Sequence, residues 1–128
     1  MSSLPEAPLL AVLPCDLTAA GRARRLLAEE CRAAGVRGDA ADSAELLVSE
    51  VVTNAVIHGR SEVRLSVCAS PRCLRVEVGD DNSRRPRVQE LDAAALDGRG
   101  LAIVDMVATR WGVADDDLGK VVWFELAV

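Results

Sequence analysis

Aromatic side chains are nearly absent from the sequence, which contains no tyrosine, one phenylalanine and two tryptophans among 128 residues. Half of the residues are nevertheless hydrophobic. A chain of this length suits one domain with one core, so the core must be built from aliphatic side chains. We expect a single domain over residues 9–128, preceded by a flexible leader over residues 1–8.

Cysteine and histidine are also scarce, and their spacing does not favour metal binding. The four cysteines form no CxxC pair, and His58 is the one histidine of the chain. Zinc sites usually combine four Cys or His ligands in close pairs, so we predict no zinc site. Four reduced, partly buried thiols are expected instead: Cys15, Cys31, Cys68 and Cys73.

Targeting signals and a basic patch are missing as well. The N-terminus, MSSLPEAPLL, lacks the charged start and the apolar stretch of a secretion signal, and no apolar run approaches the roughly twenty residues of a bilayer span. The net charge of −5 disfavours nucleic acid as a partner. It permits a small nucleotide, which needs only a few backbone N–H groups and a metal ion. We expect a cytoplasmic protein that binds neither membranes nor nucleic acid.

Helical and alternating segments are interleaved along the chain. The predicted elements are a strand over 9–15, a helix over 16–34, a helix from 39 or 42 to 58, a hairpin over 62–79, a helix opening at 98–100 and a hairpin over 111–128. Asp16 is the predicted N-cap of the first helix, and Asp39 or Asp42 that of the second. The predicted fold class is α+β: a two-layer sandwich with a mixed, mostly antiparallel sheet and helices on one face. The other face is left to solvent or to a dimer interface.

The segment SEVVTNAVIHG, residues 49–59, carries polar side chains in one line on an apolar background. Glu50, Asn54 and His58 are spaced four apart. Apolar residues occupy most of the helix circumference, which predicts burial, and a buried carboxylate needs a partner. One interpretation is a salt bridge, or an amide bonded to the backbone. The other is a pocket for a cation and a polar ligand, since Glu and Asn oxygens suit Mg²⁺.

A carboxylate is predicted to face inward at the end of the strand CLRVEVG. Because Leu74, Val76 and Val78 share one face, a period of two places Asp80 on the core side and Asp81 on the other. Asp80 would then face a ligand, or serve as a cap or turn aspartate.

A glycine turn precedes the last predicted helix, in the segment DGRGLAIVD. Gly98 and Gly100 permit close backbone approach, and the helix start offers N–H groups to an anion. A glycine-rich turn without a ligand is the alternative.

The order of these three features resembles the GHKL ATPase superfamily with its Bergerat nucleotide-binding fold. EVVTNA (50–55) is similar to the first box of that family, VEVGD (76–80) to the second and GRGL (98–101) to the third. The segments GRGLAIVD…RWGV and GKVVWFEL resemble the C-terminal half of the small anti-sigma-factor serine kinases, in their actinobacterial branch.

The resemblance implies ATP and Mg²⁺ as cofactors, with a role for each matching residue. Glu50 would be the general base, Asn54 the Mg²⁺ ligand and Asp80 the acceptor of the adenine amino group. Residues 81–97 would form the ATP lid, and His58 would be structural. The third box would bind the cofactor, with its backbone N–H groups on the phosphates: Gly98, Arg99, Gly100 and Leu101.

The resemblance further implies an anti-sigma factor that is also an ATP-dependent serine/threonine protein kinase. It would bind a sigma factor in one state, phosphorylate an anti-anti-sigma (STAS-type) partner in another, and form a homodimer. Two departures favour an alternative, a non-catalytic ATP-sensing or nucleotide-free regulator that sequesters a partner. After Asp80, DDNSR contains no glycine where the superfamily has DxGxG. Val121 also replaces a threonine that, in the branch, would help to hold adenine near the aspartate.

Overall fold

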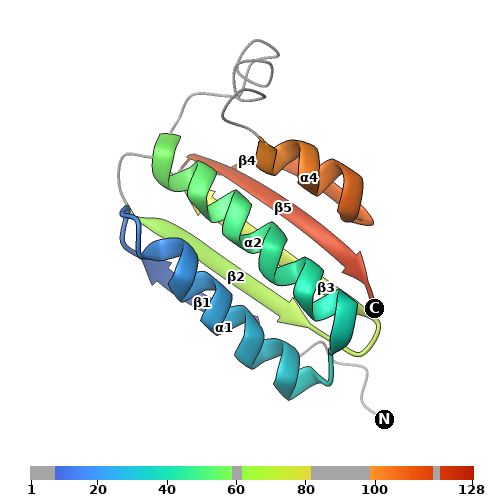
Figure 1. The fold of residues 1–128 in the computed structure, drawn as a ribbon. Coiled ribbons are helices and arrows are strands. Elements are labelled where there is room, and N and C mark those ends of the chain that lie inside the picture. Colours follow the sequence, from blue (N-terminus) through green and yellow to red (C-terminus); the bar gives the residue numbers. More distant parts are fainter. Residues whose placement is uncertain (1–7, 59–61, 82–98, 117–118) are drawn as a thin grey trace.

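The computed structural model describes residues 8–58, 62–81, 99–116 and 119–128, which form two layers (Figure 1). The strands are β1 (Leu9–Leu13), β2 (Val63–Ala69), β3 (Cys73–Asp80), β4 (Arg110–Asp116) and β5 (Gly119–Ala127). The helices are α1 (Ala19–Ala34), α2 (Gly38–His58) and α4 (Arg99–Val107). The predicted leader up to residue 7, the predicted lid beyond Asp81, Gly98 and the turn at 117–118 lie outside the described residues.

One sheet holds the described strands, in the order β1-β2-β3-β5-β4. Each neighbouring pair is antiparallel. The three helices lie on the same face of this sheet, with α2 between α1 and α4 (Figure 1). The α+β two-layer sandwich is therefore confirmed, although the predicted mixed sheet is antiparallel throughout the described strands.

The core between the layers is aliphatic, as the composition predicts. Alternate residues of the central hairpin are buried: Val63, Leu65, Val67, Leu74, Val76 and Val78. From the helices, Leu27, Leu47, Val48, Val51 and Val52 are fully buried against them. Phe124 of β5 is the one aromatic side chain in this core among the described residues. Each such side chain contributes about 1.5–3 kcal/mol through burial.

Both predicted helix caps are wrong. Helix α1 begins at Ala19 rather than just after Asp16, because the Asp16 carboxylate accepts the backbone N–H of Thr18 at 2.8 Å and also the Thr18 hydroxyl. This local turn uses the carboxylate before the helix starts. Helix α2 begins at Gly38, so Asp39 lies inside its first turn, where a carboxylate stabilises the positive end of the helix dipole.

Helix α2 is buried on one side, which corrects the prediction that it is buried all round. Leu46 is 45% exposed and Ile57 is 56% exposed. In a two-layer fold the sheet covers one side of the central helix and its neighbours cover the flanks, so the outer side faces solvent. Glu50 and Asn54 are consequently half-buried rather than buried.

The four cysteines are free thiols, as predicted, with Cys31 buried and the others half-buried. Burial raises the pKa of the Cys31 and Cys73 thiols above its ordinary value. None of the described helices combines the length and the apolar character that a membrane crossing requires.

Candidate functional site

The ends of four elements lie together at one end of the molecule. These are the C-terminal end of α2, the end of β3, the start of β5 and the start of α4 (Figure 1). Helix α2 contacts α4, β3 and β5. The fold therefore brings the predicted Glu/Asn helix, the inward aspartate and the start of the last helix into one region.

Asp80, at the end of β3, is the one charged residue that is buried in the described part of the chain, with 1% of its surface exposed. Asp81 is exposed. The alternation of buried residues along β3 predicted both orientations, because successive strand residues face opposite sides. Burying a carboxylate costs free energy unless polar groups interact with it. The groups around Asp80 therefore determine which role it can have.

Three residues position Asp80. The Arg64 guanidinium of β2 donates from Nη2 to the Asp80 carbonyl oxygen at 3.1 Å. Gly119 of β5 packs so closely that a Cβ atom there would lie 2.2 Å from the same oxygen. The Lys120 ammonium lies 4.0 Å from Asp80 Oδ2, and these two side chains are 16% and 2% exposed. The aspartate backbone is thus fixed, and its carboxylate has a cation beside it.

The C-terminal half of α2 carries Glu50 and Asn54, one turn apart. On one flank, Ser49 Oγ accepts a hydrogen bond from Arg24 Nη1 of α1 at 2.8 Å. Helix α4 contacts α2 as well, and in Figure 1 it lies on the side away from α1. His58 is the last residue of α2 and is exposed.

Helix α4 begins with the predicted third box. Arg99, Gly100 and Leu101 form its first turn, whose backbone N–H groups have no partner within the helix. The indole Nε1 of Trp111 in β4 donates to Asp105 Oδ1 at 2.9 Å. This bond joins α4 to the sheet, and the buried Val104 packs the same helix into the core.

A model of the histidine kinase-like ATPase domain family matches residues 13–126. The chain belongs to this family. The match includes α1, α2, α4, β2, β3 and β4 in full, β5 without Ala127, and only Leu13 of β1. The resemblance inferred from the three boxes is therefore confirmed at the level of the family.

The fold of this histidine kinase-like ATPase domain is similar to a crystal structure of the RsbU and RsbW domains of Rv1364c from Mycobacterium tuberculosis. The TM-score is 0.72 at 20% identity, over 95% of this chain and 32% of that one. This identity shows a shared fold. The chain spans only about a third of the length of that protein chain (32%). No curated protein matches the sequence.

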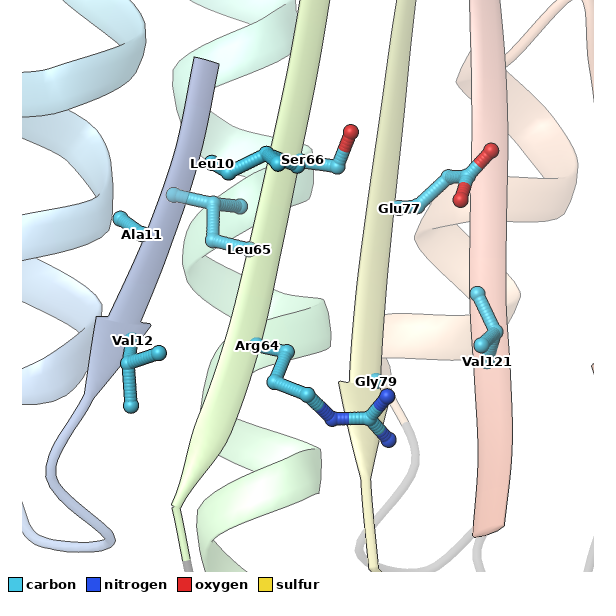
Figure 2. Close-up of a pocket in the computed structure, with 9 residues that line it drawn as sticks. All are labelled: Leu10, Ala11, Val12, Arg64, Leu65, Ser66, Glu77, Gly79 and Val121. Carbon is cyan, nitrogen blue, oxygen red and sulfur yellow. The ribbon is translucent and has the colours of Figure 1, made fainter. Parts of the chain in front are cut away.

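The structure corrects the expectation for Val121 in this ATPase domain. Val121 is the register partner of Gly79 and lines a hollow on the helix-free face of the sheet (Figure 2). Asp80 is paired instead with Lys120. Because strand side chains alternate, a hydroxyl at position 121 would point away from the Asp80 carboxylate. The residue beside Asp80 is a lysine.

The hollow on the helix-free face has a volume of about 410 Å³ and contains none of the predicted site residues. Its walls include Leu10 and Val12 of β1, and Figure 2 shows Arg64 reaching across it to Gly79. A Cβ atom at Gly79 would lie 3.0 Å from Arg64 Nη2. The missing side chain at position 79 therefore leaves room for Arg64 to reach the Asp80 carbonyl from this face.

In the described residues, no group of three or more His, Cys, Asp or Glu side chains is arranged to hold a metal ion. In ATPase domains Mg²⁺ is usually bound by one or two protein oxygens, while phosphates and water supply the remaining ligands. The half-buried Asn54 amide and Glu50 carboxylate offer oxygens of this kind.

Proposed function

We propose that the chain is an ATP-binding regulatory protein that acts as an anti-sigma factor and as a serine/threonine kinase of a STAS-type anti-anti-sigma partner. The observation that carries this proposal is the buried Asp80, 1% exposed, at the end of β3 in a member of an ATPase domain family. The fold shared with a structure that includes an RsbW domain supports the regulatory part.

Asp80 is proposed to accept a hydrogen bond from the adenine amino group. A carboxylate has only acceptors, so it selects a base that offers a donor. Arg64 and Gly119 fix the backbone of Asp80, which places the carboxylate before the ligand arrives. A fixed acceptor in a buried site discriminates strongly, because a base without the donor leaves the acceptor unpaired.

Asn54 is proposed as the protein ligand of Mg²⁺. Its amide oxygen and the absence of a larger described carboxylate cluster fit a metal held mainly by phosphates and water. When bound, Mg²⁺ neutralises the charge of the phosphates during transfer. The N–H groups at the start of α4 are proposed to hold the phosphates, from Arg99, Gly100 and Leu101 together with Gly98 outside the described residues.

Glu50 is proposed as the general base, one turn before Asn54 on α2. Its carboxylate would accept the proton of a serine or threonine hydroxyl of the partner as that oxygen bonds to the γ-phosphorus and the bond to the β-phosphate oxygen breaks. The half-buried position of Glu50 fits this role, since part of the side chain stays accessible to a partner protein.

The test is phosphoryl transfer from Mg-ATP to the cognate anti-anti-sigma protein. We expect Glu50→Gln to reduce the rate by about a hundredfold or more, the usual contribution of a general base. Glu45→Gln is the matched control, because Glu45 is also a half-buried glutamate of α2 but lies about 140° around the helix from Glu50. No transfer by the wild type, or equal rates in the two variants, would contradict the kinase role.

A second candidate is a non-catalytic regulator that senses ATP or binds a partner without any nucleotide. The glycine-free DDNSR segment favours it. Calorimetry with ATP and a phosphate-release assay separate the two candidates. ATP binding without phosphate release or transfer would support the regulator.

The partners are to be found by capture from the native cytoplasm with and without Mg-ATP, followed by mass spectrometry. The proposal predicts a sigma factor and a STAS-type protein, whose retention changes with nucleotide. Sedimentation of the purified chain tests the proposed homodimer.

A further inference from the structure

The Lys120 side chain occupies an unusual place for a lysine. It lies on β5 opposite Asp80, on the helix side of the sheet, and 16% of the side chain is exposed. Lys120 points to the same side of the sheet as Val122 and Phe124, because these residues lie two and four positions further along the strand. Lysine is rarely buried to this degree without a partner, and here the partner is the carboxylate that is proposed to bind adenine.

The two groups are near each other but too far apart for a direct hydrogen bond. The distance from Lys120 Nζ to Asp80 Oδ2 is 4.0 Å, whereas N–H···O bonds are about 2.7–3.2 Å long. An ammonium has donors only, and a carboxylate has acceptors only. The pair therefore has a donor and an acceptor side by side where β3 ends and β5 begins.

This order of donor and acceptor matches one edge of adenine. The exocyclic amino group is a donor, and the neighbouring ring nitrogen N1 is an acceptor. We propose that Lys120 donates a hydrogen bond to adenine N1 while Asp80 accepts one from the amino group, so that Lys120 determines base specificity together with Asp80. This inference rests on the proposed ATP binding. In the same pose guanine places its carbonyl oxygen at Asp80 and its N1–H at Lys120, so both contacts are mismatched.

The experiment is calorimetric titration of the full chain with Mg-ATP and with Mg-1-deaza-ATP, in which a C–H group replaces N1. We expect the wild type to bind ATP about tenfold or more tightly than 1-deaza-ATP, because a hydrogen bond to a charged group is lost. Lys120→Met should bind ATP about as weakly as it binds 1-deaza-ATP. The substitution of Lys120 and the replacement of N1 should therefore be non-additive in the free energy of binding, as expected for two groups in contact.

Val121→Thr is the control variant, since Val121 faces the opposite side of the sheet, and it should bind both nucleotides like the wild type. The wild-type comparison needs no variant, so it stands even if Lys120→Met is poorly folded. Equal wild-type affinities for the two nucleotides, or undiminished ATP binding by folded Lys120→Met, would overturn the role of Lys120 alone. A wild type that binds no ATP would overturn the proposed function together with it.

Discussion

Gly119 of β5 packs directly against the backbone of Asp80, at the point where β3 ends. A Cβ atom on Gly119 would lie 2.2 Å from the Asp80 carbonyl oxygen and 2.9 Å from Asp81 Cα. Both neighbours are backbone atoms, so neither moves aside without shifting the strand end. The proposed adenine acceptor is therefore positioned by a glycine nearly forty residues away in the sequence.

Gly119→Ala should lower the free energy of unfolding by about 2 kcal/mol or more, because the added methyl group collides with backbone in a packed sheet. Gly21→Ala is the matched control. Its Cβ atom would meet only the ends of arginine side chains, at 3.7 and 3.9 Å, within helix α1. That change should stabilise by up to about 1 kcal/mol. Urea unfolding of both variants measures the two effects, and equal effects would argue against the close contact.

Glu125 on β5 predicts how stability depends on pH. Hydrogen bonds from Arg110 and from Arg75 hold the pKa of the Glu125 carboxyl below its ordinary value of 4.5. Because the folded-state pKa is the lower one, the stabilisation is fully present above the ordinary value and is lost as the pH falls through the lowered value.

Glu125→Gln should accordingly reduce the slope of the unfolding free energy against pH below about pH 5. The bonds that give the effect are 2.8 Å from Arg75 Nη1 and 2.6 Å from Arg110 Nη2. Urea unfolding at a series of pH values measures the slope. An unchanged slope would show that Glu125 is not tied to the two arginines in solution.

The bond from Trp111 to Asp105 should help to hold α4 in place. Asp105→Ala removes the acceptor of a 2.9 Å hydrogen bond between β4 and α4, while Asp105→Asn keeps an oxygen there. Because the site is open to water, the alanine variant should lose only about 0.5–1.5 kcal/mol, with faster hydrogen exchange in α4. The asparagine variant should be closer to the wild type in stability and in hydrogen exchange. Identical exchange in the wild type and both variants would contradict the proposal that this hydrogen bond holds α4.

The sequence predicts the inward orientation of Asp80 correctly because the evidence for it is local. Three apolar residues at a period of two determine the face of the next position in the strand. The same rule, applied from Phe124 back along β5, would have identified Lys120 rather than Val121 as the residue beside Asp80. Matching the motif by its letters alone misses this, because it ignores which face of the strand each residue occupies.

Other features of the site depend on distant contacts that no local pattern contains. The reach of Arg64 to the Asp80 carbonyl depends on strand register and on the missing side chain at Gly79. Helix α2 looks buried from its composition, but Leu46 and Ile57 are exposed because only two layers form. Helix α1 starts later than predicted because the Asp16 carboxylate accepts a hydrogen bond from Thr18 before the helix begins.

The most direct test of ATP binding at this site is calorimetric titration of the wild type and Asp80→Ala with Mg-ATP, with circular dichroism to verify that both chains are folded. The wild type should bind ATP, and the variant should bind at least about tenfold more weakly, because it lacks the buried acceptor for the adenine amino group. A wild type that binds no ATP, or a folded variant with wild-type affinity, would contradict the proposal that Asp80 marks a nucleotide site.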